Sequence, residues 1–350
     1  MKILILCPYT SGICGVWERA KNEALIYKKQ GEEVYIFSSN AVKGSNEIAP
    51  AEDKLDETIS IKRYSYKKLG GESFMTWDRQ WIKDAVALAP DIIMAHNYRH
   101  PHTLGALEVA KLLKERGKMS VQVYLVTHAP FVEDNRTRSF IAACAVNIYD
   151  KVIGPRTINK FDKIMAISKW ELPYLKKMGV DEKKITVVPN PIAQEFHALP
   201  KSKMREDVLF LGRVSPVKSI ETLIKAAHLC PDIHFNIVGP VEPEYGIKLK
   251  ALIAELKVTN VEFKEPVYDI IEKIKLIDSH KVFVLPSIRE AMPTVLLEAK
   301  ARDKIIIASN NEGAREVLEG YSQGYLFEIE NCEQLAEMIK KVMKNGEKET

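Results

Sequence analysis

Two glutamates, Glu290 and Glu298, are separated by seven residues across the predicted start of a helix. The apolar run 282–285 before them predicts a buried strand, and Pro293 suits the first helical position, where its missing N–H costs nothing. We therefore expect Glu290 in a loop and Glu298 on the second helical turn. Because the first amides of a helix bind anions, the pattern favours a phosphorylated ligand such as a nucleotide sugar. Ordinary helix acids would give the same pattern.

A second charged turn lies in residues 210–219, FLGRVSPVKS, which read as the end of a strand and the start of a helix. Arg213 offers a planar fork for two phosphate oxygens, and Lys218 offers a point charge. Together they could stabilise the charge that grows on a departing diphosphate. Two cations on a turn are also typical of a solvated surface.

Two histidines are expected at the carboxyl edge of a parallel sheet, because His96 ends one predicted strand and His128 follows another. Either could bond a sugar hydroxyl or take part in proton transfer. His96, His100 and His102 also suggest a metal site. However, Arg99 stands among them and no carboxylate has ligand spacing, so we expect no metal.

Two further segments carry weaker signals. Gly12 and Gly15 in the first predicted strand-to-helix turn could let the backbone approach a ligand, but they do not form G-x-G-x-x-G, and a plain tight turn fits equally well. The segment from Lys62 to Lys68 interleaves cations with tyrosines, and Phe74, Trp77 and Trp81 follow. It could make a peripheral contact with anionic lipid headgroups, although a solvated strand and helix face is the more ordinary interpretation.

The bulk properties indicate a globular protein of two domains. The chain has 350 residues, of which 46% are hydrophobic and 28% charged. Its five cysteines are scattered without a C-x-x-C pair, so reduced thiols are expected rather than zinc or disulfides. The net charge of +4 is too small to indicate a nucleic-acid partner. No apolar run is long enough for a membrane span, which predicts a cytoplasmic location, with peripheral association at the inner membrane face as the alternative.

Short apolar runs alternate with helical windows along the chain, which predicts an α/β fold of two Rossmann-like, doubly wound domains facing each other across a cleft. We expect an N-terminal domain over 1–197, a polar linker over 198–207 and a C-terminal domain over 208–350. The window 16–29 is the clearest helix. The expected strands are 2–7, 33–37, 59–63, 91–96, 121–127, 163–166 and 186–188, then 208–211, 234–238, 261–264, 282–285, 305–308 and 325–327.

Taken together, these patterns resemble the retaining GT-B glycosyltransferases of family 4, also called group 1. The resemblance rests on DKIMAIS at 162–168, ITVVPN at 185–190, the turn with Arg213 and Lys218, and the E-x7-E string at 286–298. Glycine is common in the family where Pro191, Ser219 and Ala291 stand here, and at a second position beside Gly15. Many relatives also continue with a helix that crosses back to the N-terminal domain, whereas this chain ends soon after Lys344.

The resemblance implies roles for residues of both domains. Arg213 and Lys218 would hold the donor diphosphate, Glu298 would bond the ribose, and Glu290 would contact the donor sugar. The phosphate cradle would be completed by the amides of Ala291, Met292 and Thr294. In the N-terminal domain, the resemblance places His128 near the reacting carbon and Gly15 near the diphosphate, and His96 is expected on the acceptor side.

The sequence thus predicts a retaining glycosyltransferase that moves a hexose from a UDP-, GDP- or ADP-sugar to a hydroxyl acceptor by front-face displacement. The acceptor could be a glycan, a lipid-linked sugar or a small molecule, and neither a cofactor nor a metal is expected. One alternative is a non-catalytic nucleotide-sugar-binding protein. Another is an NAD-dependent two-domain dehydrogenase, which is disfavoured because neither domain shows G-x-G-x-x-G followed by an acid about 20 residues on.

Overall fold

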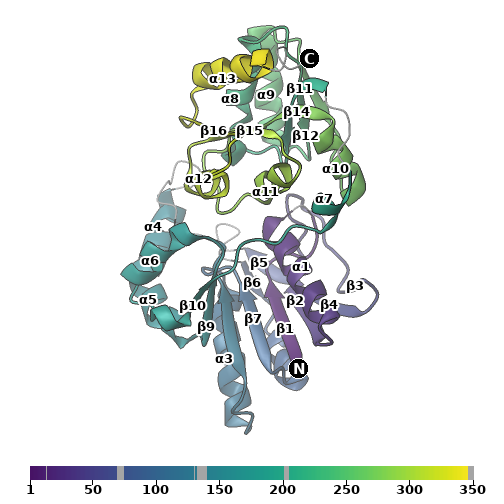
Figure 1. The fold of residues 1–350 in the computed structure, drawn as a ribbon. Coiled ribbons are helices and arrows are strands. Elements are labelled where there is room, and N and C mark those ends of the chain that lie inside the picture. The colour runs from purple at the N-terminus through teal and green to yellow at the C-terminus, as the bar shows by residue number, and fades with distance from the viewer. Residues whose placement is uncertain (13, 69–74, 130, 132–139, 201–204, 346–350) are drawn as a thin grey trace. The chain divides into compact units, whose positions relative to one another are not determined.

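The computed structural model describes the chain except residues 13, 69–74, 130, 132–139, 201–204 and 346–350 (Figure 1). By its internal contacts the chain divides into two units, Met1–Pro191 and Ile192–Thr350. This division falls before the predicted boundary at residue 197. The start of the expected linker therefore belongs to the second unit.

The first unit is built on an eight-stranded sheet with the order β10-β9-β8-β7-β1-β2-β4-β3. All neighbours are parallel except β3, which pairs antiparallel with β4 at one edge. The seven strands predicted in this half are confirmed, whereas β3 and the hairpin β5–β6 were not predicted. The strands are β1 (Lys2–Cys7), β2 (Glu33–Ser39), β3 (Glu52–Leu55), β4 (Ile59–Tyr64), β5 (Tyr66–Lys68), β6 (Met75–Trp77), β7 (Ile92–His96), β8 (Gln122–Val126), β9 (Lys163–Ala166) and β10 (Ile185–Val187).

Helix α1 (Gly15–Lys29) confirms the predicted helix and buries Trp17, Ala20 and Ala24. The same helix also buries two charged residues, Arg19 and Glu23. The other helices of this unit are α2 (Gln80–Leu88), α3 (Pro101–Glu115), α4 (Phe140–Ile148), α5 (Gly154–Thr157) and α6 (Leu172–Lys177).

The second unit contains a six-stranded parallel sheet with the order β13-β12-β11-β14-β15-β16. All six predicted strands are confirmed. Every residue of β14 is buried, as expected for a strand inside a parallel sheet with both faces covered. The elements are α7 (Glu195–Ala198), β11 (Arg205–Leu211), α8 (Ile220–His228), β12 (Phe235–Val238), α9 (Pro243–Leu256), β13 (Val261–Lys264), α10 (Ile270–Asp278), β14 (His280–Leu285), α11 (Thr294–Ala301), β15 (Ile305–Ser309), α12 (Glu312–Leu318), β16 (Gly324–Phe327) and α13 (Cys332–Asn345).

In each sheet, successive strands first add on one side of the first strand and then on its other side. In the first unit the chain starts at β1, proceeds outward through β2 and β4, and returns to the other side of β1 as β7. In the second unit it proceeds from β11 through β12 to β13 and returns as β14. In sheets of this kind, ligands bind at the carboxyl ends of the strands beside the switch point, where the connections leave opposite faces. The β1/β7 and β11/β14 ends are therefore the places to look for a site.

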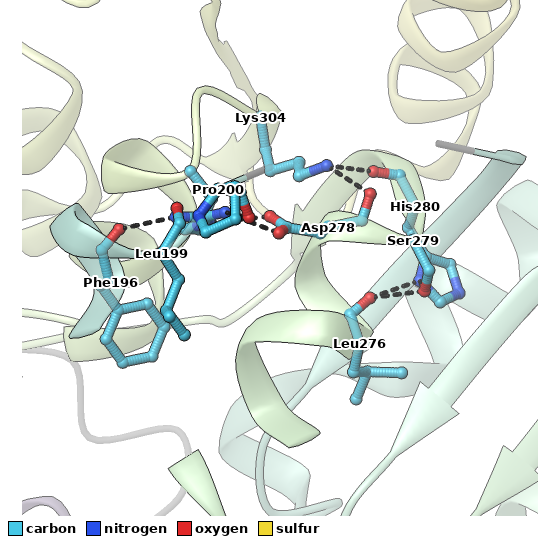
Figure 2. Close-up of polar contacts among 9 residues, drawn as sticks. Phe196, Leu199, Pro200, Leu276, Asp278, Ser279, His280 and Lys304 are labelled. Atoms are coloured by element: carbon cyan, nitrogen blue, oxygen red, sulfur yellow. Dashed lines mark hydrogen bonds and ion pairs between the residues drawn. The ribbon is translucent and has the colours of Figure 1, made fainter. Parts of the chain in front are cut away.

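Arg302 links residues 196–200 to the rest of the second unit, and Figure 2 shows Leu199 and Pro200 beside Asp278. Its Nε and Nη2 donate to Asp278 Oδ1 and Oδ2 at 2.8 and 2.6 Å. Nη1 donates to the carbonyls of Phe196 and Leu199 at 3.0 and 2.8 Å, and Nη2 also donates to the carbonyl of Pro200 at 3.0 Å. The five donors of the guanidinium are thus matched by five acceptors. These bonds explain why residues 196–200 belong to the second unit.

Part of the segment from Lys62 to Lys68 is buried, whereas Tyr66 is half-buried and Lys67 and Lys68 are exposed, so the peripheral membrane contact stays a prediction; Phe74 lies outside the described residues. Arg63 is 6% exposed and bonds Asp53 and Thr10 at 2.8 and 2.7 Å, because β4 lies between β2 and β3 and turns alternate residues inward. Tyr64 is buried, as are Trp77 and Trp81. Within the described part of the chain, no helix has the length and apolar character needed to cross a bilayer.

Candidate active site

Two predicted turns come together at the β11/β14 switch point of the second unit. Lys218, in the turn after β11, places its Nζ 2.5 Å from Glu290 Oε1, in the loop after β14. The amide of Ile288 also donates to the carbonyl of Val217 at 2.9 Å, which ties the two loops through their backbones. The side chains of Lys218 and Glu290 are 19% and 13% exposed. A cation and a carboxylate predicted from separate motifs are therefore neighbours.

Arg213 lies in the same turn as Lys218 but has a different partner. Its Nη1 is 3.1 Å from Oε1 of Glu242, which is the N-cap residue of α9. Both side chains are about a third exposed. Such ion pairs contribute little, about 0–1 kcal/mol, so Glu242 does not hold the guanidinium strongly. Glu242 was not predicted as a partner of Arg213.

The turn after β11 depends on close backbone packing. A Cβ on Gly239, which follows β12, would lie 2.0 Å from the carbonyl oxygen of Gly212. Ser219, where relatives commonly carry glycine, adopts the left-handed conformation with φ of 48°. Ala291, another of these positions, is not among the described residues with positive φ, so alanine is tolerated there without strain.

Glu298 lies on the second turn of α11, as predicted, and is 6% exposed. Its two carboxylate oxygens are each 2.6 Å from Nζ of Lys273 on α10, a partner that was not predicted. Pro293 is the N-cap of α11 and not its first residue, because its carbonyl accepts the amide of Leu296 at 3.0 Å while its own backbone is extended. The first helical residue is Thr294, and Ala291 and Met292 precede the cap.

Gly313 on α12 supports the loop that carries Glu290. A Cβ at this position would lie 2.7 Å from the carbonyl oxygen of Glu290 and 2.8 Å from that of Ala291. Gly313→Ala must therefore displace backbone atoms, since real Cβ contacts are not this short. We expect the free energy of unfolding to fall by about 1–3 kcal/mol and the affinity for a nucleotide ligand to fall with it. Urea unfolding and nucleotide titration measure both. Unchanged binding would show that this loop does not position the ligand.

A second cluster occupies the β1/β7 switch point of the first unit. His96, the last residue of β7, places Nδ1 at 2.9 Å from Nε2 of His128, two residues beyond β8. On the opposite side, His96 Nε2 is 3.3 Å from Glu23 Oε2, and Glu23 Oε1 is 2.7 Å from Arg19 Nη2. The structure thus brings the two predicted histidines together. Arg19 and Glu23 also belong to this cluster and were not predicted. They lie one helical turn apart on the apolar face of α1, and that position was the sequence signal for them.

The remaining residues of this region are structural. His102 is 2% exposed, stacks on Trp77 with ring centres 4.5 Å apart, and bonds the carbonyl of His96 at 2.8 Å. Among the described residues, no group of side chains could hold a metal ion. A Cβ on Gly12 would lie 2.4 Å from the carbonyl of Lys43, so this glycine serves a tight turn, whereas Gly15 begins α1 with open space beside it.

The loop that carries His128 is held by the buried carboxylate of Glu171. One oxygen accepts the amide of Ala129 at 3.0 Å, and the other accepts the amides of Ile167 and Ser168 at 2.7 and 3.1 Å. His128 and Ala129 have φ values of 58° and 45°, a strained pair of left-handed residues. The contacts of Glu171 therefore hold an unfavourable turn in place.

Burial raises the pKa of Glu171 to about 7, from 4.5. The folded protein keeps this proton at pH values where the unfolded chain has lost it, so the free energy of unfolding falls as the pH rises from 4.5 to 7. The contribution is up to about 3 kcal/mol. We expect Glu171→Gln to remove this part of the pH dependence, measured as urea unfolding at pH 5 and pH 7.5. Parallel pH profiles for the two proteins would contradict the assignment.

Comparisons with known proteins agree with this architecture. The family model described as Glycosyltransferase Family 4 matches residues 15–196, and that described as Glycosyl transferases group 1 matches residues 192–350. A solved structure of HepE of Anabaena in complex with UDP and glucose superposes with a TM-score of 0.73 over 99% of this chain and 91% of that one, at 17% identity.

Two curated relatives extend the comparison. An uncharacterized glycosyltransferase of Methanocaldococcus jannaschii is 26% identical over 270 residues, which are 73% of this chain and 67% of that protein. UDP-Gal:alpha-D-GlcNAc-diphosphoundecaprenol alpha-1,3-galactosyltransferase of Escherichia coli is 29% identical over 192 residues. That match spans 48% of this chain and 47%, about half, of the Escherichia coli enzyme. With both units matched in chain order and each built on a doubly wound parallel sheet, this chain belongs to family 4 of the GT-B glycosyltransferases, the group 1 glycosyl transferases.

Proposed function

We propose that the protein is a retaining glycosyltransferase that transfers a hexose from a nucleoside-diphosphate sugar to a hydroxyl acceptor. The observation that carries this proposal is the Lys218–Glu290 pair at the β11/β14 switch point, directly before the amino end of α11. A cation, a carboxylate and the first amides of a helix are the groups needed to hold a diphosphate and an attached sugar.

In the proposed reaction, Lys218 and Arg213 neutralise the diphosphate as it departs, together with amides at the start of α11. Glu290 bonds the donor sugar and Glu298 bonds the ribose. The acceptor hydroxyl attacks from the side that the diphosphate leaves, so the configuration at the reacting carbon is retained without an enzyme nucleophile. Because side chains and amides supply the positive charge, we propose that the transfer needs neither a divalent metal nor a cofactor.

The proposed acceptor is a sugar hydroxyl, and a lipid-linked sugar is the first to test. The Escherichia coli relative is named for a UDP-Gal donor and a GlcNAc-diphosphoundecaprenol acceptor. In the present chain, His128 would lie near the reacting carbon and His96 on the acceptor side. Membership of a glycosyltransferase family excludes the NAD-dependent dehydrogenase, whose G-x-G-x-x-G motif the sequence does not contain.

The test combines donor binding with product analysis. A thermal-shift panel of UDP-, GDP- and ADP-sugars, with NADH as the negative control, should show a raised Tm for one nucleotide class. That donor is then incubated with lipid-linked and free sugar acceptors, and NMR of the product should show the anomeric configuration of the donor. An inverted product would overturn the retaining mechanism. Donor binding with neither transfer nor slow donor hydrolysis would favour a non-catalytic binding protein.

A further inference from the structure

An ion pair between Lys273 and Glu298 joins α10 to α11 in the second unit. Nζ of Lys273 lies 2.6 Å from each oxygen of the Glu298 carboxylate. The two side chains are 23% and 8% exposed, whereas those of Lys275 and Glu272, another pair on α10, are 65% and 60% exposed. Because a partly buried pair is screened less than an exposed one, the attraction between Lys273 and Glu298 is the stronger of the two.

The ammonium of Lys273 has a defined position. It lies 5.8 Å from the centre of the buried Phe196 ring, which is a cation–π distance. The two acidic residues nearest to Lys273 in the sequence have other partners. Asp269 caps α10 by accepting two backbone amides, and Glu272 pairs with Lys275. Lys273 is therefore directed toward the acid on the neighbouring helix, Glu298.

The ion pair determines what kind of acceptor Glu298 is. A buried carboxylate is tolerated as an anion only when it is paired, and Glu298 is buried. The contact with both oxygens also fixes the orientation of the carboxylate at the end of a flexible side chain. A carboxylate can accept about four hydrogen bonds, so one ammonium does not saturate it. Hydrogen bonds from hydroxyls to an ionised acceptor are about twice as strong as those to a neutral one.

A ribose suits such an acceptor because its hydroxyls on C2′ and C3′ are neighbours and both can donate. A site built to accept these hydroxyls discriminates against a nucleotide that lacks one of them, since a buried acceptor then loses its donor. The strength of this discrimination depends on the charge and the orientation of the carboxylate. Both of these properties depend on Lys273.

We propose that Lys273 is a positioning residue that holds the Glu298 carboxylate as an oriented anion and thereby makes the donor site select ribonucleotides over deoxyribonucleotides. The inference rests on the contact between Glu298 and the ribose in the function proposed above. Lys273 acts through Glu298 and does not itself contact the ribose. Without the ammonium, burial favours the neutral carboxyl group, which is the weaker acceptor, so the preference for ribose decreases.

The experiment measures binding of nucleoside diphosphates to the full chain by isothermal titration calorimetry. The probes are UDP, 2′-deoxy-UDP and 3′-deoxy-UDP, or the same three forms of GDP or ADP if thermal shift selects that base. The native protein should bind the ribonucleotide about 10- to 100-fold more tightly than at least one deoxy form. In Lys273→Met this ratio should fall to nearly that of Glu298→Gln, while the affinity for the deoxy form changes little.

Two further variants separate positioning from general damage to the fold. Lys273→Arg keeps a cation beside the carboxylate and should retain most of the preference. Lys275→Met is the matched control, because it removes the lysine of an exposed pair on the same helix, and it should leave the ratio unchanged. If Lys273→Met does not fold, Lys273→Gln, which retains a hydrogen-bond donor without the charge, gives the same readout.

A double-mutant cycle tests whether Lys273 acts through Glu298. Lys273→Met should lower the ratio in the native background but not further in the Glu298→Gln background. Independent losses in the two backgrounds would overturn the proposal, as would an unchanged ratio in Lys273→Met. A raised ratio would also overturn it, because it would show that Lys273 competes with the ribose for Glu298.

The outcomes for the inference and for the proposed function are distinct. A native protein that transfers sugar but binds ribo- and deoxyribonucleotides equally would overturn the role of Lys273 and leave the transferase function standing. A ribose preference that depends on Lys273, in a protein that neither transfers nor hydrolyses any donor, would have the opposite meaning. Failure of all three nucleotide classes to bind would overturn both.

Discussion

Lys218→Ala is expected to lower kcat/KM for sugar transfer by about 10²–10³-fold, equivalent to about 2.7–4 kcal/mol of transition-state stabilisation. The cation lies 2.5 Å from Glu290 at the end of the strand pair β11/β14, and the two side chains are only 19% and 13% exposed. Glu290→Ala should have an effect of similar size, because it removes both the proposed sugar contact and the carboxylate that holds the ammonium. Initial rates with the donor identified by thermal shift give the ratio.

The matched control is Lys275→Ala. Lys275 forms an ion pair with Glu272 on α10, at 65% and 60% exposure, and removing it should leave transfer and stability unchanged. If Lys218 and Glu290 act as one unit, Lys218→Ala/Glu290→Ala should be little slower than either single variant. Turnover near the native value in both single variants, with the fold intact, would refute the site assignment.

Arg302→Met is expected to lower the free energy of unfolding of the second unit by about 3–5 kcal/mol. The guanidinium is 1% exposed and its partner, the Asp278 carboxylate, is 3% exposed. The variant leaves this carboxylate buried without its cation and also leaves the carbonyls of Phe196, Leu199 and Pro200 without their donor. Urea unfolding followed by circular dichroism measures the loss.

A double variant separates charge from shape in this cluster. Arg302→Met/Asp278→Asn has no unpaired buried charge, so it should recover a substantial part of the stability lost in Arg302→Met. Lys304, which donates to the backbone carbonyls of Asp278 and His280 at 2.7 and 2.9 Å, remains in both proteins (Figure 2). A double variant no more stable than the single one would show that the carbonyl contacts, and not the ion pair, dominate.

The strand, loop and helix around Glu290 could be predicted because the apolar run and Pro293 are strong local signals. The predicted start of α11 was wrong by one residue: Pro293 is the N-cap and not the first helical residue. Both positions suit a residue without an N–H, so the sequence does not distinguish them. Strand β3, Glu52–Leu55, was missed because it is a charged edge strand with little apolar alternation. Its partner β4 has the apolar residues of a strand and was predicted.

Partners formed by packing were harder to predict. Arg19 and Glu23 stand next to Ala20 and Ala24 on the buried face of α1, but an Arg–Glu pair one turn apart is equally common on a solvated helix. The segment 198–207 was predicted to be a linker because it is polar and aperiodic. Its first residues are instead bound through backbone carbonyls, and no residue type encodes that.

The anchoring of residues 196–200 by Arg302 has a consequence for exchanging units between relatives. The second unit carries its own amino-terminal segment, so a chimera joined within 198–207 would separate the Phe196 carbonyl from the guanidinium that binds it unless the donor protein supplied an equivalent. A junction at Pro191–Ile192 keeps all five acceptors of Arg302 on one parent. The first unit can then be exchanged while the second unit keeps these buried contacts.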